Sequence, residues 1–328
     1  MIDRAIASFA DAFSATQQLL FEKLVEPIGY ALGLANYLED AYAGCGWVLA
    51  GLLEIAILVV VIGALERWRP VEAVTDRAAV RLDIVYTLIH RLGLVRLAIF
   101  FAVEPWWDDA FGALRLQGLS TWQLDQWLAP AWPGVSDSAW FALCAYLLVF
   151  DFVDYWIHRG QHGLRWWWAL HSLHHSQRQM TMWSDNRNHL LDDLIRDTLI
   201  VVVAHAIGIA PGQFVAVVVC TQLLESLAHA NVRLGFGPWL ERALVSPRFH
   251  RLHHAMGVGH ESDDAGSLGG HNFAVLFPIW DIVFGSARFD RGYEPTGIRD
   301  QLAEAGGRDY GRGFWRQQWL GLRRMAGA

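Results

Sequence analysis

Eight histidines of this chain fall into three short clusters with helical spacing. The clusters are His158 and His162, then His171, His174 and His175, and then His250, His253 and His254. Neutral imidazole is the commonest side-chain metal ligand, and residues three or four apart share a helix face. Each cluster is therefore expected to present two or three imidazoles to one point in space. Because a zinc ion usually takes four ligands, eight imidazoles indicate two metal ions held between helices.

Isolated histidines need a separate argument. His189 precedes an apolar segment and His229 ends one, so both are expected at the level of the clusters. We predict both as ligands, which raises the set to ten, five for each metal. His260 and His271 lie in a Gly-rich stretch and are expected to be solvated or to contact a ligand.

Several polar residues lie close in sequence to the expected ligands. Carboxylates beside metal-bound imidazoles commonly accept the second ring N–H, which fixes the tautomer. On this ground Asp154 and Asp281, together with Asn231, are predicted to support the ligands. Asp151 is a further acidic residue near the end of the same apolar segment as Asp154. Glu225 lies one turn before His229 and is expected to support that histidine more readily than to bind metal itself.

The composition indicates an integral membrane protein. The chain has 328 residues, of which 54% are hydrophobic and 18% charged, and its mean hydropathy is +0.23. These values are high for a soluble protein. The net charge of -7 gives no reason to expect nucleic-acid binding. Cys45, Cys144 and Cys220 are far apart and form neither a disulfide framework nor a Cys-x-x-Cys pair.

The apolar pattern predicts an all-α, polytopic membrane protein with a helical cap that carries the histidines. Residues 46–65 are the clearest span, interrupted only by Glu54, and residues 84–103 are a weaker one. No signal peptide is evident. The expected regions are an N-terminal amphipathic or extramembrane segment at 1–45, transmembrane helices with a non-cytoplasmic loop at 46–138, a histidine-box catalytic domain with a membrane hairpin at 195–228 within 139–290, and a C-terminal tail at 291–328.

Arginines suggest how the chain is oriented. Arg67, Arg69, Arg77 and Arg81 follow the first span, and the positive-inside rule assigns such a flank to the cytoplasm. Residues 158–189 and 229–328 then lie on the same side, so all three clusters face one compartment. We expect a bacterial inner-membrane protein with a cytoplasmic metal site. The tail is rich in arginine and aromatic residues and is typical of a segment on the membrane surface.

The order of the motifs resembles a known family. The motifs are Asp151-Phe-Val-Asp-Tyr-Trp-Ile-His158-Arg159, His171-Ser-Leu-His174-His175, His229-Ala-Asn231, Pro247-Arg-Phe-His250-Arg-Leu-His253-His254, Asn272-Phe273 and Trp280-Asp281-Ile-Val-Phe284-Gly285-Ser286. Over about residues 140–290 they resemble the fatty acid hydroxylase/sterol desaturase superfamily. The family's isolated histidines match His189 and His229. Ala274 and Ser286 replace the usual Gly and Thr, and neither position is a ligand.

The resemblance implies an activity that the spacing alone does not. Imidazole also suits zinc, copper and nickel, whereas the family uses two iron ions to activate O2. It implies oxidation of a C–H bond in a membrane lipid such as a sterol or a fatty-acyl lipid, with hydroxylation favoured over desaturation as the simpler outcome. An external ferredoxin or cytochrome, with its reductase, is expected to supply electrons. The alternative is a haem- or zinc-binding membrane protein without oxygenase activity.

Overall fold

The computed structural model describes residues 2–94, 106–107, 109–118, 124–131 and 138–327. This part of the chain is helical, with one isolated antiparallel bridge between Ala255 and Thr296 and no strand, so the predicted all-α class is confirmed. The α-helices are α1 (Ile2–Leu20), α2 (Glu26–Ala31), α3 (Leu38–Ile57), α4 (Gly63–Trp68), α5 (Arg77–Arg91), α7 (Leu124–Leu128), α8 (Ala139–Gly163), α9 (Arg165–His175), α10 (Leu190–Ile207), α11 (Pro211–His229), α12 (Gly237–Leu240), α13 (Pro247–His253), α14 (Ile279–Val283) and α15 (Phe314–Ala326). The π-helical turns are η1 (Phe21–Val25) and η3 (Leu58–Ile62), and the 3-10 turns are η2 (Ala35–Tyr37), η4 (Ser184–Asn186), η5 (Arg299–Gln301) and η6 (Ala303–Ala305).

The chain divides into two compact units. The first consists of Met1–Ile57 and Leu88–Asp108, and the second of Leu58–Thr87 and Asp109–Ala328. In the first unit, Arg91 Nη1 donates to Glu54 Oε2 at 2.6 Å, and both side chains are buried. This pair explains how a carboxylate is accommodated inside the predicted span, because a buried charge needs a partner. Gly51 permits the approach, since a Cβ there would lie 1.8 Å from the Arg91 carbonyl oxygen.

Two helical stretches of the described residues are long and apolar enough to cross a membrane. They are Ala35–Trp68 and Ala139–Gly163, and they are consistent with a helical membrane protein. The first is longer than the predicted 46–65 because the helical stretch also includes residues 35–45 and 66–68, which contain charged side chains. The predicted 84–103 span is only partly described: α5 ends at Arg91, and residues 95–105 lie outside the described residues.

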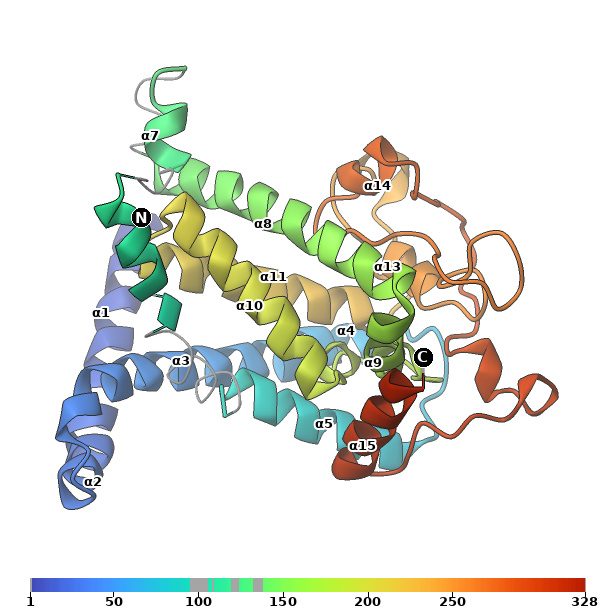
Figure 1. The fold of residues 1–328 in the computed structure, drawn as a ribbon, viewed down its shortest axis with the longest axis horizontal. Helices are drawn as coiled ribbons and strands as arrows, with labels where there is room; N and C mark the ends of the chain where they lie inside the picture. Colours follow the sequence, from blue (N-terminus) through green and yellow to red (C-terminus); the bar gives the residue numbers. More distant parts are fainter. Residues whose placement is uncertain (1, 95–105, 108, 119–123, 132–137, 328) are drawn as a thin grey trace. The chain divides into compact units, whose positions relative to one another are not determined.

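The second unit is built on three long helices. Helices α8, α10 and α11 run roughly along one another (Figure 1) and enclose an apolar core. The buried core residues are Ala142, Tyr146, Phe150, Ala204 and Val217. Helices α10 and α11 occupy the segment predicted as a hairpin at 195–228, and Gly208 ends α10 in a left-handed conformation. Helices α9 and α13 lie at the end of α8 that carries His158 and His162 (Figure 1).

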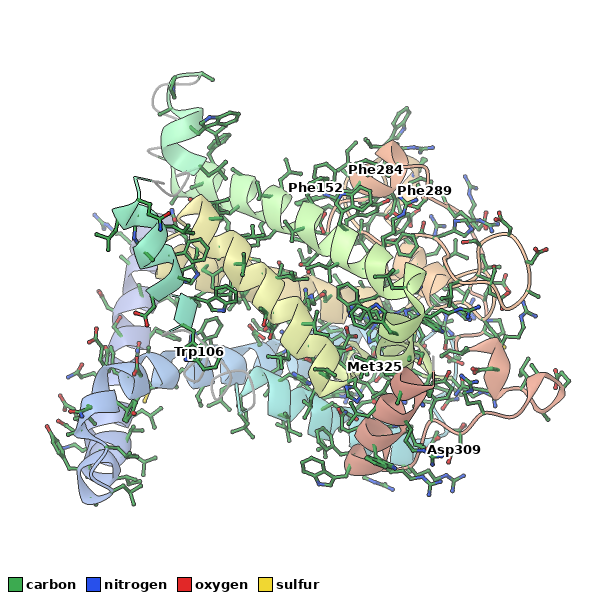
Figure 2. All side chains as sticks on the ribbon, in the orientation of Figure 1. Trp106, Phe152, Phe284, Phe289, Asp309 and Met325 are labelled. Carbon is green, nitrogen blue, oxygen red and sulfur yellow. The ribbon has the colours of Figure 1, made fainter. Side chains whose placement is uncertain are left out.

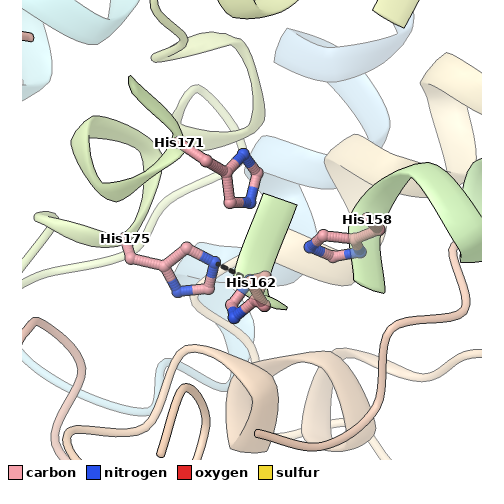
Figure 3. Close-up of side chains that lie close together, drawn as sticks. All are labelled: His158, His162, His171 and His175. Carbon is pink, nitrogen blue, oxygen red and sulfur yellow. Dashed lines mark hydrogen bonds between the residues drawn. The ribbon is translucent and has the colours of Figure 1, made fainter. Parts of the chain in front are cut away.

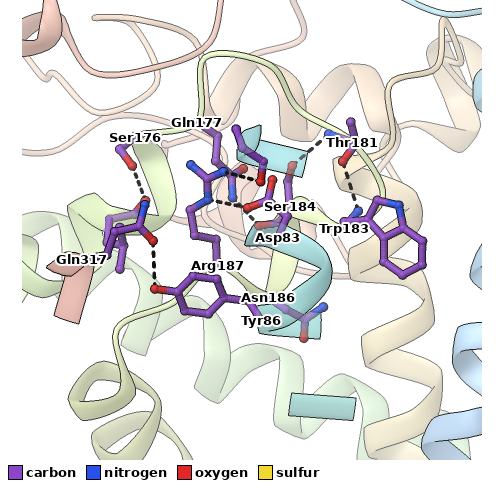
Figure 4. A network of polar contacts seen from close by, with 12 residues as sticks. Asp83, Tyr86, Ser176, Gln177, Thr181, Trp183, Ser184, Asn186, Arg187 and Gln317 are labelled. Atoms are coloured by element: carbon purple, nitrogen blue, oxygen red, sulfur yellow. Dashed lines mark hydrogen bonds and ion pairs between the residues drawn. The ribbon is translucent and has the colours of Figure 1, made fainter. Parts of the chain in front are cut away.

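A polar network fixes the connection between α9 and α10 (Figure 4). Arg187 Nε donates to Asp83 on α5, and both side chains are buried. Gln177 Nε2 donates to the Ser184 carbonyl oxygen at 2.5 Å, and the Ser184 hydroxyl accepts from the Thr181 amide at 2.9 Å. Hydrogen bonds between buried polar groups favour one arrangement of the segments that they join. The loop that follows the second histidine cluster is therefore held rigidly against α5.

Candidate metal centre

Four helices of the second unit supply the clustered histidines. His158 and His162 lie in the last turns of α8, and His229 is the last residue of α11. The two His-x-x-His-His boxes form the ends of α9 and α13. Helix α13 begins with Pro247 in its first turn and with Ser246 as its N-cap, whose hydroxyl accepts from the Phe249 amide at 3.1 Å. Both features favour helix initiation at this point.

The histidines form two adjoining buried groups that could each hold a metal ion. Group A consists of His158, His162, His171 and His175 (Figure 3), and group B consists of His174, His229, His250 and His254. Within each group the nearest ring nitrogens all lie within 4.8 Å of one another. The ring of His253 lies 4.4 Å from that of His158 and 4.7 Å from those of His162 and His175, measured between centroids. Nine of the ten predicted ligands are thus brought together.

The histidines of each His-x-x-His-His box do not all lie in one group. His171 and His175 of the second box lie in group A, while His174 lies in group B. In the third box His250 and His254 lie in group B, whereas His253 lies between the two groups. Its ring is 4.4 Å from that of His158, and its nearest nitrogen lies within 4.8 Å of those of His175 and His254. The expectation that each cluster points to one place in space was therefore wrong for the second box, whereas His253 and His254 of the third box stay together in a further set of possible ligands.

Hydrogen bonds at Nδ1 determine the tautomer of five rings. The Nδ1 atoms of these rings donate to oxygen atoms that can only accept: His158 to Phe273 O at 2.7 Å, His162 to Gly269 O at 3.0 Å, His253 to His271 O at 2.7 Å, His229 to Glu225 O at 2.8 Å, and His171 to Asp192 Oδ2 at 3.0 Å. A neutral ring that carries its proton on Nδ1 keeps a lone pair on Nε2. These five Nε2 atoms are therefore available as metal ligands.

The Nε2 atoms face one another at distances that suit a shared cation. The separations are 3.0 Å for His162 and His175, 3.1 Å for His229 and His174, 3.0 Å for His250 and His229, and 3.2 Å for His254 and His250. Two nitrogens bound at about 2.1 Å to one ion lie roughly 3.0–3.4 Å apart. The buried Nε2 atoms of His158, His171 and His253 have no hydrogen-bond partner among the described residues. Unsatisfied buried nitrogens in this arrangement fit metal coordination.

Asp192 supports group A, and it was missed in the sequence. Its carboxylate accepts from Gln161 Nε2 and Trp167 Nε1, both at 2.7 Å, as well as from His171. The residue lies in the first turn of α10, three positions after His189, among other acidic residues. Nothing in that local pattern separates it from a solvated helix start, because its three partners are on α8 and α9.

Two buried carboxylates hold the loop whose carbonyl oxygens orient the histidines. Asp281 accepts from the amides of Phe273 and Ala274 at 2.9 and 2.8 Å, and from the Ser286 hydroxyl at 2.6 Å. Asp151 on α8 accepts from the amides of residues 275–277 at 2.7–3.2 Å. Asp281 therefore acts on His158 through Phe273: it accepts from the Phe273 amide, and the Phe273 carbonyl oxygen accepts from His158 Nδ1. Upstream, Gly269 has a φ of 136° and presents its carbonyl oxygen to His162, a backbone conformation that favours glycine.

The remaining predicted site residues make other contacts. His189 Nδ1 accepts from the Leu191 amide at 3.1 Å and caps α10, and its Nε2 donates to the Gln318 carbonyl oxygen at 2.8 Å. Both nitrogens are thus engaged with the backbone, away from groups A and B. Asp154 pairs with Arg196 at 2.9 Å, and Glu225 lies 3.6 Å from the same guanidinium group.

Asn231 also has a role in the backbone arrangement. Its Oδ1 accepts from the Val71 and Glu72 amides, both at 3.1 Å, and its Nδ2 donates to the Glu72 carbonyl oxygen at 2.8 Å. The side chain therefore fixes the segment that follows α4. Its contacts join that segment to the turn directly after His229.

Trp168 separates group A from a small pocket. The pocket has a volume of about 210 Å³ and is lined by residues that include Trp168, His260 and Arg299. The indole stacks on His260 with ring centroids 5.3 Å apart, and it lies 4.9 Å from His162 and 5.4 Å from His175. His260 is buried rather than solvated. Its ring centroid lies 6.1 Å from that of His175 in group A.

Burial keeps the histidines neutral. It lowers the pKa of His253 to about 3, and it holds the pKa values of four other rings well below the usual value for imidazole. Those rings are His174, His175, His250 and His254, and neighbouring imidazoles lower their pKa values further. Neutral imidazole is the form that binds a metal. The site is therefore prepared for a cation at neutral pH.

The same shifts predict that acid destabilises the metal-free protein. Unfolded histidine takes up a proton near pH 6.5, whereas these folded imidazoles stay neutral to lower pH, so the unfolded state binds more protons as the pH falls. Stability then decreases by up to about 1.4 kcal/mol per histidine for each pH unit below that value. We expect the apparent melting temperature of metal-stripped protein in detergent to fall from about pH 7.5 to about pH 5.5. An unchanged melting temperature over this range contradicts the prediction, and metal-loaded protein is the comparison.

The region that contains these histidines is similar in sequence to known proteins. The sequence matches the fatty acid hydroxylase family over residues 143–286, a range that contains the eight histidines of groups A and B as well as His253. Over these residues the chain is thus similar to the fatty acid hydroxylase/sterol desaturase superfamily. The resemblance seen in the motifs is thereby confirmed.

Curated relatives of this superfamily differ in the lipids that their names give. The chain is 25% identical to an ornithine lipid hydroxylase of Rhizobium tropici over 70% of its own length and 64% of that protein. It is 31% identical to an alkylglycerol monooxygenase of Danio rerio over 46% of its length and 31% of the relative. A Δ7-sterol 5(6)-desaturase of Gibberella zeae is 29% identical over 35% and 36%, respectively. The chain thus spans less than two thirds of these relatives, and no solved structure matches it.

Proposed function

We propose that this protein is an O2-dependent oxygenase that hydroxylates or desaturates a C–H bond of a membrane lipid at a di-iron centre held by groups A and B. The observation that carries the proposal is the pair of adjoining, buried, all-imidazole groups at the ends of helices, one of which is apolar enough to cross a membrane. The family match and the lipid-oxidising relatives support the reaction class.

The histidines of groups A and B, with His253, would hold the two ions. Bound iron supplies the redox chemistry that activates O2 and that zinc lacks. Hydroxylation converts R–H, O2, two electrons and two protons into R–OH and water. Desaturation uses the same inputs, removes two hydrogens from adjacent carbons and yields two waters. The electrons come from an external one-electron donor, for which a ferredoxin or a cytochrome with its reductase is the proposed partner.

The chain's own contribution is to orient the ligands and to keep the site dry. Nδ1–H donors lock the tautomers, and the loop clamped by Asp151 and Asp281 sets the ring planes. Phe273 places its ring 5.8 Å from His158 and 5.2 Å from His162. A water-poor site strengthens electrostatic interactions and limits side reactions. The aromatic wall continues through Tyr155, whose ring stacks on Phe284 at 5.4 Å.

The geometry does not favour a haem carrier. Axial ligation requires two imidazoles on opposite faces of a porphyrin, whereas ring nitrogens here approach to 3.0–3.2 Å. No space for a macrocycle remains between rings at this separation. Zinc could bind to the same imidazole nitrogens. The test of function therefore includes a metal analysis that distinguishes iron from zinc.

The setting of the reaction completes the proposal. The substrate class is a membrane lipid, in keeping with the ornithine lipid, alkylglycerol and sterol named for the relatives. We place the protein in a bacterial inner membrane with groups A and B on the cytoplasmic side. The arginines after α4 support that orientation through the positive-inside rule.

The function is tested by isotope labelling in cells. Lipid extracts of cells that express the wild-type chain, cells that express His174→Ala and cells without the gene are compared by mass spectrometry after growth under 18O2. We expect one lipid class in wild-type cells to gain 18O or to lose two hydrogens, and no such change in the other two. Identical extracts contradict the proposed activity. Purified protein that contains zinc alone after iron-replete expression, with no O2-dependent product, supports the zinc alternative.

A further inference from the structure

On helix α15, polar residues face the protein interior and large apolar residues face outward. Its buried residues are the polar Gln317 and Gln318 with Gly321, and its exposed residues include large apolar side chains. Trp315 is 77% exposed, Trp319 61% and Leu322 37%. Positions 315, 319 and 322 are four and three residues apart, so these side chains lie on one face. An outward-facing apolar surface of this kind is typical of a helix that contacts lipid or another protein on that face.

The inner face of α15 is firmly attached to the histidine-bearing body. Gln318 accepts from the Leu190 amide at 2.8 Å through Oε1 and donates through Nε2 to Tyr86 at 3.0 Å. Arg324 Nε donates to the Ala169 carbonyl oxygen of α9 at 3.2 Å. Gly321 allows close packing, since a Cβ there would lie 2.3 Å from the His189 ring. The orientation of the helix is therefore fixed, and its apolar face stays outward.

Charge identifies the class of partner. Residues 311–328 contain Arg312, Arg316, Arg323 and Arg324 and no acidic residue. Arg312 and Arg323 are exposed beside the apolar face, while Arg316 pairs with the exposed Asp309 at 2.7 Å. Tryptophan and arginine together are typical of the lipid headgroup layer, where the indole has one apolar and one polar edge. An arginine near an anionic membrane surface is attracted to its phosphate groups.

The place of α15 in the second unit agrees with a membrane contact. It packs on α9, which directly follows the candidate span α8 (Figure 1). Figure 2 labels Met325, near the C-terminal end of α15, and Asp309, which lies in the segment before the helix. Across the same end of α8, α14 also exposes apolar residues, Ile279, Ile282 and Val283. Exposed apolar side chains thus occur on both sides of the body at the level where α8 ends.

We propose that α15 lies in the headgroup layer of an anionic membrane, with Trp315, Trp319 and Leu322 in the lipid and Arg312 and Arg323 against phosphate groups. This role is independent of the proposed reaction. The helix binds lipid on one face and α9 on the other. It thereby connects the membrane surface to the helix that carries the second histidine box.

Site-directed spin labelling tests this placement in the full chain. The three cysteines are replaced by Ala, and one label is introduced at Leu322→Cys, with Asp264→Cys in an exposed loop as the matched control. The protein is studied in nanodiscs of phosphatidylcholine with phosphatidylglycerol. Accessibility to O2, which partitions into lipid, is compared with accessibility to a water-soluble nickel chelate. We expect the O2-to-nickel ratio at 322 to exceed that at 264 several-fold.

Two other outcomes overturn the proposal. Equal ratios at 322 and 264 place the helix in water, and protection of 322 from both reagents places it against another protein. The charge argument has its own test, Arg312→Glu with Arg323→Glu. These substitutions are expected to lower the ratio at 322 in discs that contain phosphatidylglycerol and to change it little in pure phosphatidylcholine. An unchanged ratio in the anionic discs contradicts the proposed contact of the two arginines with headgroup phosphates. Circular dichroism is used to check that each variant is folded.

Discussion

His171→Ala and His250→Ala are each expected to lose one of two bound metal ions, from group A and group B respectively. Each group offers four imidazoles within 4.8 Å, and removal of one leaves an incomplete site at which water must replace nitrogen. We expect product formation to fall by about two orders of magnitude or more in either variant, because a catalytic metal contributes several kcal/mol of transition-state stabilisation. Elemental analysis of purified protein, expressed with iron, measures the loss directly.

His189→Ala is the matched control for these variants. The ring of His189 caps α10 and bonds to Gln318 of α15, so its removal is expected to lower stability by about 1–3 kcal/mol while both metals are retained. Loss of a full metal ion in His189→Ala contradicts the assignment of this residue to the backbone. Retention of both ions in His171→Ala or His250→Ala contradicts groups A and B as metal sites.

Asp192→Asn is expected to weaken metal binding in group A by about 10–100-fold. The substitution keeps the size of the side chain, and the amide oxygen can still accept from Gln161 and Trp167. The amide nitrogen then faces His171 Nδ1 as a second donor, which favours the tautomer with the proton on Nε2. A protonated Nε2 cannot bind a metal. One exchange of oxygen for nitrogen thus disables a ligand 3.0 Å away.

Chelator competition measures this effect. We expect Asp192→Asn to release one metal ion at a chelator concentration that leaves both in the wild type, and the second ion to dissociate as in the wild type. Asp263→Asn, in an exposed loop, removes the same charge and controls for electrostatics at long range. Equal chelator sensitivity in Asp192→Asn and Asp263→Asn argues against the tautomer mechanism.

The sequence was most informative where ligands share a local period. Spacing identified His158 with His162 and both His-x-x-His-His boxes, because three- and four-residue intervals are properties of a single helix. It did not separate i+3 from i+4, whereas the structure places His174 of the second box in the other group from His171 and His175. On a helix, residues i+3 and i+4 lie about 100° apart around the axis. Only the positions of the neighbouring helices decide which of the two a given site uses.

Long-range partners could not be predicted in the same way. Asp192 lies in a run of acidic residues at a helix start, and its donors are 21 to 31 positions away. The carbonyl oxygens of Gly269, His271 and Phe273 carry no side-chain signature at all. His189 shows the opposite case, since a histidine at a helix start resembles a ligand but serves here as an N-cap. Proximity in sequence to the boxes was a poor guide to proximity in space.

Because α9 and α13 each present histidines to both groups, they act as rigid spacers between groups A and B. Because each helix contributes to both sites, a rotation of either helix that shortens bonds at one site lengthens them at the other. The separation of two ions bound by these groups would then be governed by the helical rise of about 1.5 Å per residue, and loop length would have little influence on it. Insertion of one residue into either box would put both sites out of register at once. Binding of the first ion should likewise orient imidazoles for the second, so that the pair is loaded cooperatively.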